Sequence, residues 1–195
     1  MFNIFSKKNK TEFPMSAEIL SKEGFSVHYT DVLRDEIAHT HSAKLIARGN
    51  NYLMTALIIL GKLKEADEIF SVTNIKKLNT EMKCNFLNNY IVSKFLRDEF
   101  DECNRLYTEQ NEYVLAVNIS SMRRTVGIHE YIAERFDNAV TVFLKLDNDV
   151  RFRDLCLVKT FIALDMKKEA RMFMKNFPKY ENDLKEIAAG LNAKL

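Results

Sequence analysis

The chain has 195 residues, of which 47% are hydrophobic and 29% charged, with only 5 Gly and 2 Pro. This length fits one domain or a short repeat array, and so few Gly and Pro favour long helices with short polar loops over a strand-rich fold with many tight turns. The 29 basic and 27 acidic residues give a formal net charge of +2. Nucleic-acid-binding domains typically carry a concentrated basic charge, which this near-balance does not indicate, so no nucleic-acid partner is expected.

The first 41 residues are expected to be an N-terminal arm followed by an irregular, partly helical segment. Ser16 is a suitable N-cap and predicts a short helix that ends at Gly24. The stretch 25–29 alternates like a strand. Because a lone strand has no partner here, this stretch is predicted to be an extended connector. A second helix is predicted over 31–38, where apolar residues share one side.

From Ser42 onward, apolar residues recur at helical spacing. The helix that begins there is predicted to end at Gly61. The stretch 60–70, which crosses this helix end, then returns at 96–107, 132–143 and 164–174. Each copy has a small residue at the same place, and these four residues are separated by 37, 36 and 31 positions: Ala66, Cys103, Ala139 and Ala170. This spacing indicates an internal repeat of helical hairpins.

The repeated stretch resembles the tetratricopeptide repeat, whose period is about 34 residues. In that family, a large apolar residue follows the turn between helix A and helix B, a small residue comes three positions later, and a large aromatic residue comes four after that. The matching residues are Leu63, Ala66 and Phe70, then Phe100, Cys103 and Tyr107, then Phe136, Ala139 and Phe143. The fourth copy departs from this pattern at Lys167, and only the first copy has the family's turn glycine, Gly61.

The resemblance implies an all-α fold, a right-handed α-solenoid of about four helical hairpins over residues 42–178. One hairpin cannot bury its apolar face alone, so stacked neighbours are expected to supply the core. Beyond Pro178, an apolar stripe predicts a cap helix over 179–195 that covers the open end of the array.

In the family that the repeats resemble, helix A lines a concave groove that binds peptides. The resemblance therefore implies a partner-binding groove in which asparagines bond a peptide backbone and Phe95 and Tyr131 hold an apolar side chain; the alternative is that some of these residues are core. The adjacent bases Arg123 and Arg124 suggest a grip on a carboxylate or phosphate, with a solvated pair of charges as the alternative. Carried onto this chain, the groove comprises Asn51, Thr55, Asn88, Asn89, Val92, Phe95, Arg124, Ile128 and Tyr131. Only Asn89 matches the clamp that part of the family uses for C-terminal carboxylates, so binding of that kind is not expected.

One cluster of metal-type ligands suggests a different chemistry. It consists of His28, Asp31, Glu36, His39 and His41, and its spacing matches none of the common metal signatures. The alternative to a binding module is thus a small helical enzyme or metalloprotein that uses the His28–His41 cluster. No phosphate-binding glycine loop, nucleophile elbow or zinc-protease motif occurs in the chain.

The sequence therefore predicts a non-catalytic scaffold or adaptor, without metal or cofactor, that binds a protein or peptide partner in its groove. Self-association through a face of the array is a further possibility. Three isolated cysteines, no secretory leader and no long apolar run favour a cytoplasmic protein without a membrane span.

The first prediction concerns the small residues at the contact between helices A and B. Ala139→Leu should lower the free energy of unfolding by roughly 1–3 kcal/mol, because the larger side chain overpacks that contact. Urea denaturation measures the change, and a variant as stable as the wild type would contradict the repeat register.

Overall fold

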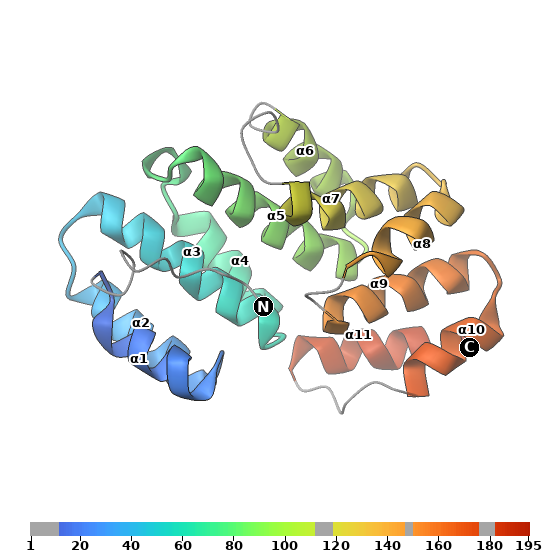
Figure 1. Cartoon of the computed structure of the whole chain (residues 1–195), viewed down its shortest axis with the longest axis horizontal. Helices are drawn as coiled ribbons and strands as arrows, with labels where there is room; N and C mark the ends of the chain where they lie inside the picture. The colour runs from blue at the N-terminus through green and yellow to red at the C-terminus, as the bar shows by residue number, and fades with distance from the viewer. Residues whose placement is uncertain (1–11, 112–118, 147–149, 176–181) are drawn as a thin grey trace. The chain divides into compact units, whose positions relative to one another are not determined.

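The computed structural model describes residues 12–111, 119–146, 150–175 and 182–195. Within these ranges the chain forms eleven α-helices and one 3-10 helix and no β-strand, so the all-α prediction is confirmed for this part (Figure 1). Among the described helices, none has both the length and the apolar character needed to cross a membrane. The helices are α1 (Pro14–Glu23), α2 (Val27–Ala38), α3 (Ala43–Ile59), α4 (Leu63–Val72), η2 (Ile75–Lys77), α5 (Thr80–Leu96), α6 (Phe100–Asn111), α7 (Ile119–Ile132), α8 (Phe136–Leu144), α9 (Val150–Ala163), α10 (Lys167–Lys175) and α11 (Asp183–Asn192).

The chain divides into two compact units, residues 1–90 and 91–195. In the first unit α2 packs against both α1 and α3, and α3 packs against α4. In the second unit α8 packs against both α7 and α9, and α9 packs against α10. Helices that are neighbours in sequence are thus neighbours in space, as expected for a chain of helical hairpins.

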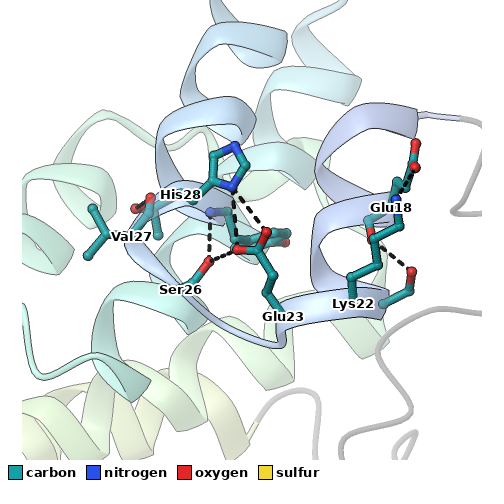
Figure 2. Close-up of polar contacts among 9 residues, drawn as sticks. Glu18, Lys22, Glu23, Ser26, Val27 and His28 are labelled. Atoms are coloured by element: carbon teal, nitrogen blue, oxygen red, sulfur yellow. Dashed lines mark hydrogen bonds and ion pairs between the residues drawn. The ribbon is translucent and has the colours of Figure 1, made fainter.

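The prediction of an extended connector at 25–29 is wrong, because α2 already begins at Val27. The Ser26 hydroxyl accepts a hydrogen bond from the Tyr29 amide at 3.0 Å and so caps the helix (Figure 2). Tyr29 and Leu33, one helical turn apart, are both buried. The apparent two-residue alternation was therefore the start of a helical pattern that a window of five residues is too short to distinguish.

A carboxylate from α2 completes the start of α1. Glu36 accepts hydrogen bonds from the Met15 amide at 2.9 Å and the Ser16 amide at 3.1 Å, which satisfies donors that the first turn of a helix leaves unpaired. Close to this contact, α2 and α3 approach so tightly that a Cβ on Gly49 would lie 2.5 Å from the side chain of Ile37. The polar contact thus joins α1 to α2, and the close approach at Gly49 packs α2 against α3.

Four turns share one backbone geometry. Each contains a residue with a left-handed φ, at 75°, 62°, 59° and 56° for Gly61, Asp98, Glu134 and Asp165. In the first turn the Gly61 amide donates to the Ile58 carbonyl at 3.0 Å, and the Lys62 amide donates to the Leu57 carbonyl at 2.8 Å. The same two bonds recur in the other three turns, and they define the Schellman motif that ends a helix.

The small residues lie five positions after these turn residues. Ala66, Cys103, Ala139 and Ala170 are at most 1% exposed. In the third hairpin the helices also approach at Gly127 on α7, where a Cβ would lie 2.5 Å from the Phe143 ring of α8. The four predicted copies therefore have the same turn and the same buried small position, whereas only the first has a glycine in the turn.

The last helix, α11, begins at Asp183 and packs against α9. Leu184 and Leu191 from the predicted apolar stripe are buried, at 1% and 5% exposure. The first part of the predicted 179–195 helix, with Tyr180, lies outside the described residues.

A second prediction follows from the left-handed turn residues. Glu134→Gly should raise the free energy of unfolding by about 1 kcal/mol, because glycine adopts this conformation without the steric penalty of a Cβ. Asp98→Gly should instead destabilise, because it leaves the buried Lys159 ammonium without this partner, and Gly61→Ala should destabilise as well. Urea denaturation of the three variants tests this order, and a destabilised Glu134→Gly would contradict the assigned backbone conformation.

Candidate functional site

The nine predicted groove residues lie on three successive helices A, namely α3, α5 and α7. Eight of them are at most 9% exposed, and only Tyr131 is partly exposed. Four belong to the first unit and five to the second. They are, in chain order, Asn51, Thr55, Asn88, Asn89, Val92, Phe95, Arg124, Ile128 and Tyr131. Most of this face is therefore packed against other parts of the chain.

In the first unit, the predicted polar residues form a buried link between α3 and α5. The Thr55 hydroxyl donates to the Asn51 backbone carbonyl at 2.8 Å and accepts from the Asn89 side-chain amide at 3.0 Å. The Asn51 side-chain carbonyl is buried and has no hydrogen-bond partner among the described residues. This side-chain oxygen is the one unsatisfied group of the Asn51–Thr55–Asn89 link. Leaving a buried acceptor unpaired costs about 1–3 kcal/mol.

In the second unit, the predicted aromatic residues form a packed cluster. Phe95 is fully buried, and its ring contacts Tyr131 edge-on at a centroid distance of 4.9 Å. Tyr131 also contacts Phe136 at 5.2 Å and Phe100 at 5.9 Å. Burial raises the pKa of Tyr131 to about 12, with Asp98 adding to the shift. Phe95 therefore stabilises the core, and within this cluster Tyr131 is the predicted groove residue with surface to offer a partner.

Sequence reasoning missed Lys159, a buried lysine of the second unit. Its side chain is 5% exposed, its ammonium forms an ion pair with Asp98, and it lies 5.2 Å from the centre of the Phe95 ring. The repeat register contained the information needed to find it. Lys159 precedes Asp165 by six residues, as Thr55, Val92 and Ile128 precede their own turn residues.

Two of the repeated turns are also joined by side-chain ion pairs. In the second copy Lys94 pairs with Glu99 at 2.8 Å, and in the third copy Glu130 pairs with Arg135 at 2.7 Å, with the charges exchanged. The same residues are also joined through the backbone. The Glu99 amide donates to the Lys94 carbonyl, and the Arg135 amide donates to the Glu130 carbonyl, as part of each Schellman motif. The side chains at these two positions usually make an apolar contact, so the second and third copies replace that contact with charge.

The ion pair in the third copy perturbs a carboxyl group. Hydrogen bonds from Arg135 at 2.7 and 2.9 Å and from Asn138 at 3.1 Å lower the pKa of Glu130 to about 2. The pair lies at the protein surface, where solvent screening limits its effect on stability.

The thiols in the described part of the chain are unfavourable nucleophiles. All three cysteines are free and buried. Burial raises the pKa of Cys103 to about 12 and raises the pKa of Cys84. Since the thiolate is the reactive form, neither of these two groups has the low pKa that thiol catalysis requires.

The structure does not gather the histidines into a metal centre. His28 lies at the start of α2, with its Nδ1 3.3 Å from both Glu23 oxygens (Figure 2). His39 caps the other end of the same helix, where its Nδ1 lies 2.8 Å from the Asp35 backbone carbonyl. Eleven residues of helix separate the two rings by about 16 Å along the axis. The described residues contain no group of three or more His, Cys, Asp or Glu side chains placed to hold a metal ion.

Comparison with known proteins identifies no relative. No family model matches the chain, and no curated protein or solved structure matches it either. The likeness to tetratricopeptide repeats therefore rests on the repeated residues and turns themselves.

A third prediction uses the lowered pKa of Glu130. Above its ordinary pKa of 4.5 the carboxylate is charged in both folded and unfolded chains, so the full contribution of the pair is present. As the pH falls from about 4.5 to about 2, the unfolded chain takes up the proton first and this contribution is lost. The stability difference between wild type and Glu130→Gln, measured by urea denaturation, should therefore be constant near neutral pH and shrink below about pH 4.5.

The matched control removes the partner. In an Arg135→Gln background, Glu130→Gln should show much less pH dependence, because the largest cause of the lowered pKa is gone. If the stability difference between wild type and Glu130→Gln, both of which keep Arg135, does not change with pH, the ion pair is contradicted.

Proposed function

We propose that the protein is a non-catalytic binding module, a scaffold or adaptor that holds a protein or peptide segment along the helix A face of a tetratricopeptide-like solenoid. The observation that carries this proposal is the fourfold recurrence of the same Schellman turn, followed five residues later by a buried small residue. Such equivalent hairpins, stacked as a right-handed solenoid with α11 as its cap, would present successive helices A at regular intervals.

The burial of the predicted groove residues refines how a partner would bind. Fully buried side chains such as Val92, Phe95 and Ile128 would support the binding face rather than touch the partner. The position three residues before each turn residue holds Ile58, Phe95, Tyr131 and Ile162. Tyr131 and Ile162 are partly exposed, so we place the partner's apolar anchor against these two residues of the second unit.

The thiols and charges favour binding over chemistry. The raised pKa values of Cys84 and Cys103 oppose a nucleophilic role, and the free, buried state of all three cysteines supports a reducing, cytoplasmic environment. The near-balanced net charge of +2 supports a protein or peptide partner over a nucleic acid. No specific observation favours the alternative of a metalloprotein built on His28–His41.

The fourth prediction tests the binding face by site-specific photo-crosslinking. Benzoylphenylalanine replaces Tyr131 or Ile162 on the proposed face, and Asn104 or Thr141, exposed on helices α6 and α8, in the controls. After irradiation in lysate of the native host, the Tyr131 and Ile162 positions should yield adducts of one common partner, identified by mass spectrometry. The control positions should not yield this adduct.

A second step makes the test quantitative. The crosslinked segment is synthesised, and its affinity for the wild type and for Tyr131→Ala is measured by calorimetry. Tyr131→Ala removes one aromatic contact with the partner, so it should weaken binding by about tenfold or more. Circular dichroism of this variant should show an unchanged helix content. Adducts that form equally at Asn104 or Thr141, or no common adduct at all, would overturn the proposal.

A further inference from the structure

The α1–α2 hairpin has an excess of acidic residues, of which Asp31 and Asp35 share one exposed face. Residues 14–38 contain the carboxylates Glu18, Glu23, Asp31, Asp35 and Glu36 against the bases Lys22 and Arg34, a net charge of −3. Both bases are engaged within the first unit, Lys22 with Glu18 and Arg34 with Glu65, each at 2.6 Å. Asp31 and Asp35 lie exposed one turn apart on α2, where residues four apart share a face.

The helix α10 presents a basic face. Four exposed bases, Lys167, Lys168, Arg171 and Lys175, stand against the single acid Glu169, a net charge of +3 over nine residues. Lys168, Arg171 and Lys175 are spaced three and four residues apart and so share one side of the helix. The opposite side, with Ala170 fully buried, packs against α9. The charged side of α10 therefore faces away from α9, and on it the Arg171 guanidinium donates to the Leu195 backbone carbonyl.

Both faces also carry exposed apolar side chains. Met15 and Val27 are 54% and 51% exposed in the acidic hairpin, and Met166 and Met172 are 38% and 60% exposed beside the basic face. Val27 precedes Asp31 by one turn, and Met172 neighbours Arg171. Each face thus combines charge of one sign with large apolar groups that remain in water, a combination found at interaction surfaces.

From this complementarity we propose that the chain associates head to tail, with the Asp31–Asp35 face of one copy bound to the Lys168–Lys175 face of a second copy. Because the two faces differ, the contact is heterologous, and a pair keeps one free basic face on one copy and one free acidic face on the other for further copies. Exposed ion pairs are individually weak and screened by salt, so the association is concentration-dependent and strongest at low ionic strength. It is independent of the peptide-binding face proposed above, which uses other residues.

The test is sedimentation velocity of the full chain from about 10 µM to about 500 µM, in about 50 mM and about 500 mM salt. Wild type should associate at low salt and dissociate at high salt. The acid-reversed variant, Asp31→Lys with Asp35→Lys, and the base-reversed variant, Lys168→Glu with Lys175→Glu, should each lower the association constant by at least about tenfold. A matched control, Glu68→Lys with Asp137→Lys at exposed positions of α4 and α8, adds the same charge elsewhere and should associate like wild type.

Mixing tests whether the intact basic face of one variant binds the intact acidic face of the other. An equimolar mixture of the acid-reversed and base-reversed variants has complementary faces again and should recover association. The neutral variants Asp31→Asn and Lys168→Gln provide a milder pair if a reversal lowers the helix content. A wild type that remains monomeric at low salt, a control variant as impaired as the reversed variants, or a mixture that stays monomeric would each overturn the proposal.

A vesicle arm distinguishes an anionic membrane surface as the occupant of the basic face. Wild type and the base-reversed variant are co-sedimented with vesicles of phosphatidylserine and phosphatidylcholine. No binding by either protein agrees with the head-to-tail contact. Binding by a monomeric wild type that is lost in the base-reversed variant would assign the α10 face to lipid and overturn it.

Discussion

The Schellman turn between helices A and B is the constraint on which the repeats depend. A helix leaves its last carbonyls unpaired, and the turn satisfies two of them within three residues while it reverses the chain. Only a left-handed backbone at one position allows both bonds. Gly61 adopts it without strain, whereas Asp98, Glu134 and Asp165 adopt it with a Cβ, at a cost that the packing of each hairpin must offset.

In each copy the residue five positions after the turn residue lies on helix B and is buried. That residue is small in all four copies, from Ala66 to Ala170, and is at most 1% exposed. In the third hairpin, Gly127 opposite Phe143 brings the two helices closer still. The ion pairs Lys94–Glu99 and Glu130–Arg135 then join the two ends of their turns. Backbone and packing thus act at the same few positions of all four copies, and charge joins them in the second and third.

The helix A face combines this regular scaffold with buried polar groups. Asn51, Thr55 and Asn89 in the first unit, and Lys159 in the second, are placed where an ordinary core would hold apolar side chains, and Lys159 pairs with the exposed turn residue Asp98. Buried polar groups are tolerated when paired, and these are paired except at the Asn51 carbonyl oxygen. The same register positions were expected to meet a partner directly, and burial instead leaves that role to residues such as Tyr131.

The sequence by itself determined the helical class and located the four stretches that share a turn and a buried small residue, because helical periodicity and small residues at fixed spacing are local properties of the chain. It also located the end of the third helix at Gly61. The tertiary structure decided the rest. It alone showed that Asp98, Glu134 and Asp165 take the conformation of Gly61, that α2 begins at Val27, and that Lys159 is buried against Phe95. These outcomes depend on contacts between residues distant in sequence, whose energies override the weak local preferences that sequence patterns record.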